Sequence, residues 1–282
     1  MTRGSCLCGT VRWEFDGPPG EMSHCHCTMC RKAHGAPFAT YLSAPAAAFR
    51  TTAGEEAVRL YESSPGFHRA FCSGCGSVTP FPVAGGSRYA VPAGGLDDDA
   101  GVRPARHIFF ASKAPWHRVA DDLPKDAAYP EGGPAEIARP DRAGGKPGVL
   151  KGSCLCGGVE FEVEEPFVAA HNCHCSRCRK ARAAAHTTNG FVPVDRFRFT
   201  KGADLVDRYK IPEAVSFTQA FCRTCGSGLP RIREDAGVAI FPLAPLDDVP
   251  AQGADDHIFV ASKAAWYELP EDGLPRFTEG AG

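Results

Sequence analysis

The chain has 282 residues and a mass of 30.0 kDa, with 43% hydrophobic and 23% charged residues, a globular composition that excludes disorder as its main state. Its 31 basic and 33 acidic residues leave a formal charge of −2, which argues against a nucleic-acid or membrane-surface partner. The most apolar stretch, 36–49, is interrupted by polar residues and prolines, so we expect no membrane span. The first residues lack the apolar region of a secretory signal, and we expect a cytoplasmic protein.

Short strands separated by many turns are predicted along the chain. Apolar and polar residues alternate at 11–15 and 159–163, as is typical of half-buried strands. Further strands are predicted at 41–42, 58–61, 197–199 and 257–260, and short helices at 29–33 and 177–185. Trp116 and Trp266 are predicted to pack in the core. The fold class is therefore predicted to be mostly β, with small antiparallel sheets.

Four sequence blocks occur twice, which indicates a tandem duplication. All 14 cysteines lie in these blocks, seven in each copy. We predict two domains, residues 1–122 and 149–278, joined by a linker at 123–148 that is rich in proline and glycine. The paired blocks are 4–9 and 152–157, 25–33 and 173–181, 70–77 and 220–227, and 107–116 and 257–266.

Four cysteines of each copy are predicted to form a closed metal site. The C-x-x-C-G segments at 72–76 and 222–226 are typical of zinc knuckles. The C-x-C pair at the start of each copy can join the knuckle in a tetrahedral site, if Gly9 adopts a positive φ that lets the backbone curl. The predicted ligands are Cys6, Cys8, Cys72 and Cys75 in the first copy, and Cys154, Cys156, Cys222 and Cys225 in the second.

Three further cysteines of each copy lie close together in sequence. Three thiolates leave one position of a tetrahedral zinc ion for water or substrate, which is typical of catalytic sites. Alternatively a histidine closes the site, and only His26/His174 and His107/His257 match between the copies. Thiolate donors favour zinc over iron or copper, so we expect two Zn²⁺ per domain and four per chain. The three-cysteine ligands are Cys25, Cys27 and Cys30, and Cys173, Cys175 and Cys178.

A basic pair follows each three-cysteine segment: Arg31 and Lys32 in the first copy, Arg179 and Lys180 in the second. These cations would offset the negative charge of the thiolate sites and lower the thiol pKa values. The alternative is that they are solvated surface charges.

The motifs G-S-C-x-C-G, C-H-C-x-x-C-R-K, F-C-x-x-C-G-S and H-I-F, in this order, resemble the GFA family, the glutathione-dependent formaldehyde-activating enzymes and their relatives, including the domain of centromere protein V. The resemblance covers nearly all of each copy. It implies a β-tent fold with two zinc ions per domain, one structural on four cysteines and one catalytic on three. It assigns the same cysteines to these sites as the spacing does.

The resemblance also implies an activity. The family's namesake reaction adds glutathione to formaldehyde, so we expect a zinc-dependent carbon–sulfur lyase of the S-(hydroxymethyl)glutathione synthase type, acting on glutathione or another thiol adduct of a small aldehyde. Arg31, Lys32, Arg179 and Lys180 would bind a substrate carboxylate. Copy two has alanine and histidine where copy one has Gly35 and Phe38, so we expect copy one to be the more typical active unit.

Two other functions fit the motifs. A non-catalytic, zinc-stabilised binding module would have both sites saturated by protein atoms. A thiol redox protein would use the C-x-x-C pairs, but glycine-flanked knuckles favour bound metal instead.

Overall fold

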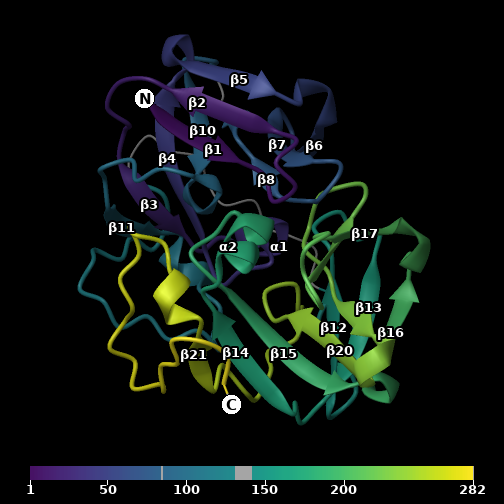
Figure 1. The fold of residues 1–282 in the computed structure, drawn as a ribbon. Helices are drawn as coiled ribbons and strands as arrows, with labels where there is room; N and C mark the ends of the chain where they lie inside the picture. Colours follow the sequence, from purple (N-terminus) through teal and green to yellow (C-terminus); the bar gives the residue numbers. More distant parts are fainter. Residues whose placement is uncertain (84, 131–141, 282) are drawn as a thin grey trace.

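The structure, a computed structural model, describes residues 1–83, 85–130 and 142–281. Its two β-rich halves, copy one and copy two, lie one above the other in Figure 1, in purple-blue and green-yellow. The helices α1 (Thr28–His34) and α2 (Ser176–Arg182) lie together between the halves. Nδ1 of His34 lies 2.7 Å from the carbonyl oxygen of Arg182, so the ends of the two helices are in direct contact.

Copy one forms three small sheets, with strand orders β1-β2-β5, β11-β3-β4-β10-β9 and β6-β7-β8. In β2 the apolar residues Trp13 and Phe15 are buried while Arg12 is exposed, which is the predicted alternation. The strands are β1 (Thr2–Ser5), β2 (Arg12–Phe15), β3 (Met22–Cys25), β4 (Ala39–Pro45), β5 (Phe49–Ala53), β6 (Val58–Ser64), β7 (Phe67–Cys72), β8 (Val78–Thr79), β9 (Phe81–Pro82), β10 (Arg88–Pro92) and β11 (Pro104–Ile108).

Copy two repeats this architecture, with strand orders β12-β13-β16, β19-β20-β15-β14-β21 and β17-β18. In both copies one strand pair is parallel, β11 with β3 and β21 with β14, and the other pairs are antiparallel. The strands are β12 (Val149–Ser153), β13 (Glu160–Glu164), β14 (Ala169–Cys173), β15 (Thr187–Pro193), β16 (Phe197–Lys201), β17 (Val206–Lys210), β18 (Thr218–Cys222), β19 (Arg231–Arg233), β20 (Val238–Pro242) and β21 (Asp256–Ile258). The prediction of a mostly β tandem duplication is confirmed.

Helix α2 is shorter than predicted, because Ala183 turns the chain into the left-handed region at φ 49°. This turn packs against Gly94 of copy one so closely that a Cβ there would lie 2.1 Å from the backbone nitrogen of Ala184. Tertiary packing between the copies thus ends the helix three residues before 185. The predicted strand at 257–260 also ends early, because Phe259 adopts φ 57°.

The two copies interlock rather than fold around separate cores. Trp266 and Tyr267 of copy two belong to the same buried cluster as Trp13 of copy one, while Ile108 and Phe109 of copy one belong to the cluster of copy two. Trp266 is therefore a core residue, as predicted, whereas Trp116 is only partly buried.

The first part of the predicted linker pairs with copy one. The amide of His107 donates to the carbonyl of Pro124 at 2.8 Å, and the amide of Asp126 donates back to the carbonyl of His107 at 2.9 Å. Residues 131–141 of the predicted linker lie outside the described residues. The domain limits 1–122, 123–148 and 149–278 stay predictions. None of the helices in the described ranges is long and apolar enough to cross a membrane.

Candidate metal centres

Each copy brings its N-terminal C-x-C pair onto its knuckle. The sulfur atoms of Cys6, Cys8, Cys72 and Cys75 all lie within 4.8 Å of one another, as do those of the matching four in copy two. Cys8 Sγ lies 3.4 Å from Cys6 Sγ and 3.7 Å from Cys72 Sγ. A tetrahedral zinc ion with Zn–S bonds of about 2.3 Å requires sulfur atoms about 3.8 Å apart. The four-cysteine clusters therefore fit zinc, and in copy two the members are Cys154, Cys156, Cys222 and Cys225.

Glycine shapes both turns of the four-cysteine cluster. Gly9 has φ 73°, as predicted, and its amide donates to the carbonyl of Cys6 at 3.1 Å. Gly76 has the same φ, and a Cβ there would lie 2.3 Å from the ring of Phe221. The same packing occurs in reverse between Gly226 and Phe71. Each C-x-x-C-G knuckle thus packs against the phenylalanine that precedes the knuckle of the other copy.

A cation would relieve the electrostatic cost of gathering these thiols. Hydrogen bonds with Cys6, Cys75 and Cys8, together with burial, raise the pKa of Cys72 far above its ordinary value. Four adjacent thiolates repel one another, and a divalent cation offsets that repulsion.

The three-cysteine clusters lie at the starts of the two helices. Cys25 is the last residue of β3, and Cys27 caps α1, because its Sγ accepts a hydrogen bond from the backbone amide of Cys30 at 3.3 Å. The sulfur atoms of Cys25 and Cys27 lie 3.6 Å apart. All three thiols are at most 5% exposed. The pKa of Cys30 is held well below its ordinary value by hydrogen bonds from Cys25 and Cys27 and by the positive charge of Arg69.

Copy two repeats this cluster with Cys173, Cys175 and Cys178, whose sulfurs also lie within 4.8 Å of one another. Cys175 Sγ accepts the amide of Cys178 at 3.3 Å. Hydrogen bonds from the other two thiols lower the pKa of Cys175 to about 3. Within the described residues, no histidine nitrogen or carboxylate oxygen joins either group of three sulfurs at that distance.

Arg69 supplies a buried positive charge to the first three-cysteine cluster. It is 5% exposed, and its Nη1 and Nη2 lie 3.6 and 3.5 Å from Cys30 Sγ. The matching residue of copy two is Gln219, which donates to the carbonyl of Ala181 at 3.5 Å. Copy two instead places the guanidinium groups of Arg182 and Arg231 in the electric field of Cys178. Both clusters thus have a positive neighbour, from different positions in the sequence.

A chain of hydrogen-bonded side chains reaches each three-cysteine segment. Nε2 of His107 lies 2.9 Å from the carboxylate of Asp121, and its Nδ1 lies 2.8 Å from Nε2 of His26. Copy two has the same arrangement, Asp272–His257–His174, with both distances 2.9 Å. The alternative that a matched histidine closes the site is not what the structure shows, since among the described residues no histidine nitrogen belongs to either group of three sulfurs.

One ring nitrogen of His26 is buried without a partner. Nε2 of His26 lies 2.8 Å from Nδ1 of His107, and Nε2 of His107 lies beside the Asp121 carboxylate. Burial lowers the pKa of His26 to about 2, so its ring is neutral. Nδ1 of His26 has no hydrogen-bond partner among the described residues, and neither has Nδ1 of His174 in copy two.

The lysines expected to bind substrate contact the other copy instead. Nζ of Lys32 lies 2.7 Å from Asp247 Oδ1, 2.9 Å from Ser153 Oγ and 2.8 Å from the carbonyl oxygen of Ser153. It also donates to the carbonyl of Pro245 at 3.2 Å and is 6% exposed. Lys180 makes the reciprocal contacts to Ser5, Gly95 and Asp97, in copy one. All hydrogen bonds described for the two lysines thus cross between copies.

The neighbouring arginines donate to backbone carbonyls. Nε of Arg31 donates to the carbonyl of His26 at 3.3 Å, and its side chain is half-buried. Arg179 donates to the carbonyls of Gly94 and Leu96 in copy one, at 3.4 and 3.3 Å. Substrate binding by Arg31, Lys32, Arg179 and Lys180 remains a prediction.

The motifs of the sequence did not indicate the carboxylates Asp121 and Asp272 or the guanidinium of Arg69 as parts of the sites. The two aspartates share a signal, because each is followed two residues later by a leucine whose amide donates to its Oδ1 at 3.1 Å. Arg69 has no such signal, since copy two has glutamine at its position.

Both copies of the chain resemble a known protein family in sequence. The profile of the family described as "glutathione-dependent formaldehyde-activating enzyme" matches residues 1–112 and 149–262, once per copy. A protein of Halomonas elongata is 32% identical over 149 residues, which cover 48% of this chain and 93% of that protein. A protein of Fusarium vanettenii is 29% identical over 133 residues, 43% of this chain and 64% of that protein. Both carry the name "putative glutathione-dependent formaldehyde-activating enzyme".

A crystal structure of a Rhodobacter sphaeroides protein is also similar in sequence, with 30% identity. The match covers 36% of this chain and 91% of that protein, with a TM-score of 0.30.

Proposed function

Since this chain belongs to the family of glutathione-dependent formaldehyde-activating enzymes, we propose that it is a zinc-dependent enzyme of the carbon–sulfur lyase type, acting on glutathione or another thiol adduct of a small aldehyde. The observation that carries the proposal is the pair of three-sulfur clusters, each beside an Asp–His–His chain and each with three protein ligands among the described residues. Four zinc ions per chain would fill the four cysteine clusters.

Zinc held by Cys25, Cys27 and Cys30 would leave its fourth position to an outside thiol or carbonyl oxygen and would act as a Lewis acid there. In the addition reaction, the thiol sulfur forms a bond to the carbonyl carbon, the thiol S–H bond breaks, and the proton ends on the former carbonyl oxygen. Nδ1 of His26 is buried without a protein partner and could accept a hydrogen bond from the substrate. Asp121 lies beside His107 and His107 beside His26, so these contacts would orient the His26 ring.

The protein's charges suit an anionic thiol. Arg69, whose guanidinium lies beside Cys30 Sγ, would offset the net negative charge of three thiolates holding one Zn²⁺. Arg31 is half-buried near the end of the same segment and could meet a substrate carboxylate. In copy two the more exposed Cys175 supports access to that cluster as well.

Two measurements test the proposal. Metal analysis should find four zinc ions per chain, and calorimetry with reduced glutathione should show binding that Cys27→Ala weakens. Exchange NMR of glutathione with formaldehyde should show faster formation of the hydroxymethyl adduct with the protein than without it. A fully metallated chain that neither binds glutathione nor accelerates the exchange would overturn the proposal.

The burial of the first cluster favours a second function, a non-catalytic zinc-stabilised binding module. Cys25, Cys27 and Cys30 are only 4–5% exposed, which restricts access to a metal there. This alternative predicts zinc binding with no acceleration in the same NMR experiment. We also propose a cytoplasmic location, since the clusters require reduced cysteines.

A further inference from the structure

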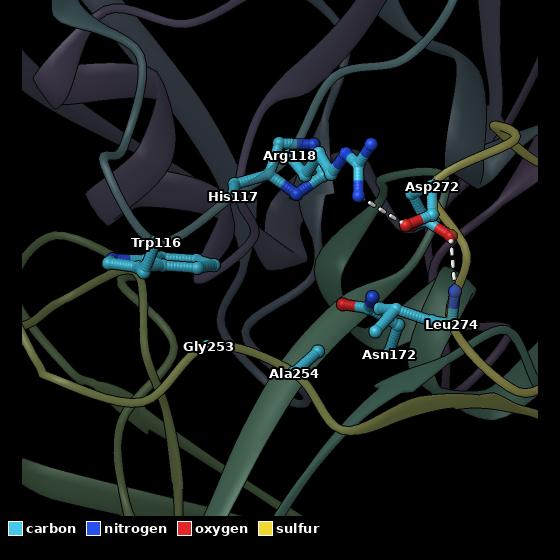
Figure 2. A pocket seen from close by; sticks show the side chains of 8 residues that line it. All are labelled: Trp116, His117, Arg118, Asn172, Gly253, Ala254, Asp272 and Leu274. Atoms are coloured by element: carbon cyan, nitrogen blue, oxygen red, sulfur yellow. Dashed lines mark hydrogen bonds between the residues drawn. The ribbon is translucent and has the colours of Figure 1, made fainter.

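A cavity of about 120 Å³ lies between the two copies, apart from the four cysteine clusters. Figure 2 shows the Trp116 ring along one side and the Arg118 guanidinium directed toward Asp272. Copy one contributes three consecutive residues and copy two contributes a strand and two loops. The lining residues are Trp116, His117, Arg118, Asn172, Gly253, Ala254, Asp272 and Leu274.

The side-chain oxygens of Asp272 and Asn172 in this cavity each accept a hydrogen bond from the protein. Each carboxylate oxygen of Asp272 accepts a hydrogen bond, from His257 Nε2 at 2.9 Å and from the amide of Leu274 at 3.1 Å. Oδ1 of Asn172 accepts from the hydroxyl of Thr188 at 2.7 Å.

The donors, in contrast, have capacity left. Arg118 has five N–H groups, and its one described hydrogen bond runs from Nη1 to the carbonyl oxygen of Asp272 at 2.7 Å. No carboxylate of the described residues forms an ion pair with it. The side-chain nitrogen Nδ2 of Asn172 has no described hydrogen-bond partner among those residues. Burial lowers the pKa of His117 to about 3, so its neutral ring offers one N–H. A ligand that only accepts hydrogen bonds and carries a negative charge complements these donors, while the Asp272 carboxylate of the lining is paired with His257.

Size and shape restrict that ligand further. An engineered cavity of about 150 Å³ holds benzene, so 120 Å³ suits a molecule of about five or six non-hydrogen atoms. The Trp116 ring gives it one apolar wall. We propose that the cavity binds a short-chain carboxylate, with the carboxylate on Arg118 and Asn172 and the carbon chain against Trp116.

The duplication predicts one such site per chain rather than two. The corresponding space at copy one is lined by His24, Asp121 and Tyr267 and holds only about 10 Å³. His24 occupies the position of Asn172, and its ring packs against Phe38 and Tyr267 at 4.6 and 6.2 Å between ring centres. Arg118 also lines this smaller space, so the lack of volume, and not a loss of positive charge, excludes a ligand there. The rings of His24, Phe38 and Tyr267 thus fill the space at copy one, whereas the space at Asn172 stays open.

The site is connected to a metal centre. Asp272, which lines the cavity, holds His257, and His257 holds His174 between the cysteines of the second three-cysteine cluster. A carboxylate bound beside Asp272 would therefore alter the electrostatic surroundings of the hydrogen-bonded residues Asp272, His257 and His174. Binding itself requires no metal and no thiol, so it is independent of the proposed enzymatic function.

Propionate, propionamide and propylamine provide a matched probe set, because they have similar sizes and different charges. Trp13 and Trp266 are 2% and 3% exposed, so Trp116 is the tryptophan best placed to report binding by fluorescence. We expect propionate to bind one site per chain with a Kd of about 1 mM, as befits so small a ligand. The amide and the amine should bind at least tenfold more weakly. Trp116→Phe should remove the fluorescence signal while calorimetry still detects binding.

Substitutions in the lining test the assignment directly. Arg118→Gln should weaken propionate binding about tenfold to a hundredfold, the range expected for one charge-assisted hydrogen bond. Arg59→Gln is the matched control, since Arg59 is also exposed and also donates to one backbone carbonyl. Asn172→His, which copies the residue of copy one, should close the cavity and abolish binding. Circular dichroism and thermal melting establish that each variant is folded.

Three results would overturn the proposal: equal binding of propionate and propionamide, two equivalent sites per chain, or unchanged binding in folded Arg118→Gln. Cys27→Ala and Cys175→Ala should still bind propionate. Loss of glutathione binding with retention of propionate binding would thus separate the two functions.

Discussion

Nζ of Lys32 in copy one lies 2.7 Å from Asp247 Oδ1 in copy two, and both side chains are less than a tenth exposed. Lys32 follows the last ligand of its three-cysteine cluster by two residues, and it also contacts Ser153, which directly precedes the ligand Cys154. The reciprocal pair, Lys180 with Asp97, has a distance of 2.6 Å. Each candidate catalytic helix is therefore anchored beside the four-cysteine centre of the other copy.

Loss of this anchor should destabilise the whole chain. Lys32→Met leaves Asp247 as a buried, unpaired charge, and breaking such a pair costs about 3–5 kcal/mol. Urea denaturation should show this loss of unfolding free energy. Lys180→Met is the matched control and should cost less, because the Asp97 side chain is 41% exposed. Equal effects of the two substitutions would contradict the role of burial.

The four-cysteine and three-cysteine clusters should respond differently to substitution. Cys72→Ala removes a ligand of a closed site whose knuckle packs against Phe221, so both copies should lose stability. Cys27→Ala should abolish activity or glutathione binding while leaving most of the fold. Zinc content and thermal unfolding measure both effects. Similar unfolding by the two variants would mean that the structural and catalytic assignments are wrong.

Arg69 should set the pH dependence of zinc binding at the first three-cysteine cluster. After the hydrogen bonds from Cys25 and Cys27, its positive charge also lowers the pKa of Cys30, which favours the thiolate that binds zinc. Arg69→Gln, which copies Gln219, should raise that pKa and weaken apparent zinc affinity about tenfold at pH 7. The deficit should shrink as the pH rises, because the thiol then loses its proton unaided. Competition with a chromophoric chelator measures this, and the cluster of copy two is the internal control.

Asp121 should be required for turnover rather than for folding. Asp121→Asn removes the acceptor that fixes the His107 tautomer, and we expect kcat to fall at least about tenfold with KM little changed. Asp122→Asn alters the exposed neighbouring carboxylate and should have no effect. Unchanged kcat in Asp121→Asn would remove the Asp–His–His chain from the mechanism.

The same carboxylate predicts an acid-sensitive contribution to stability. Although burial acts to raise it, the hydrogen bond from His107 lowers the pKa of Asp121 from 3.8 to about 2. Its contribution is therefore complete above about pH 4 and is lost as the pH falls toward 2. Acid unfolding of Asp121→Asn should lack this component between pH 4 and 2. A wild-type and a variant curve of identical shape would contradict the pairing.

Local patterns in the sequence determined the duplication, the β-rich class and the membership of all four cysteine clusters. The reason is physical: a metal needs ligands at short, fixed separations, and C-x-C and C-x-x-C spacings record those separations in the chain itself. The alternation in β2 and β13 likewise records which face is buried.

Only the tertiary structure decided the surroundings of those clusters. Lys32 reads as a surface cation or a substrate ligand in the sequence, yet its partner Asp247 is 215 residues away. Arg69 reaches Cys30 from 39 residues away, and Asp121 reaches His26 only through His107. The cavity at Trp116 exists because two copies of one fold meet with unlike side chains, Asn172 against His24. Contacts between distant segments leave no spacing pattern, so packing alone brings them together.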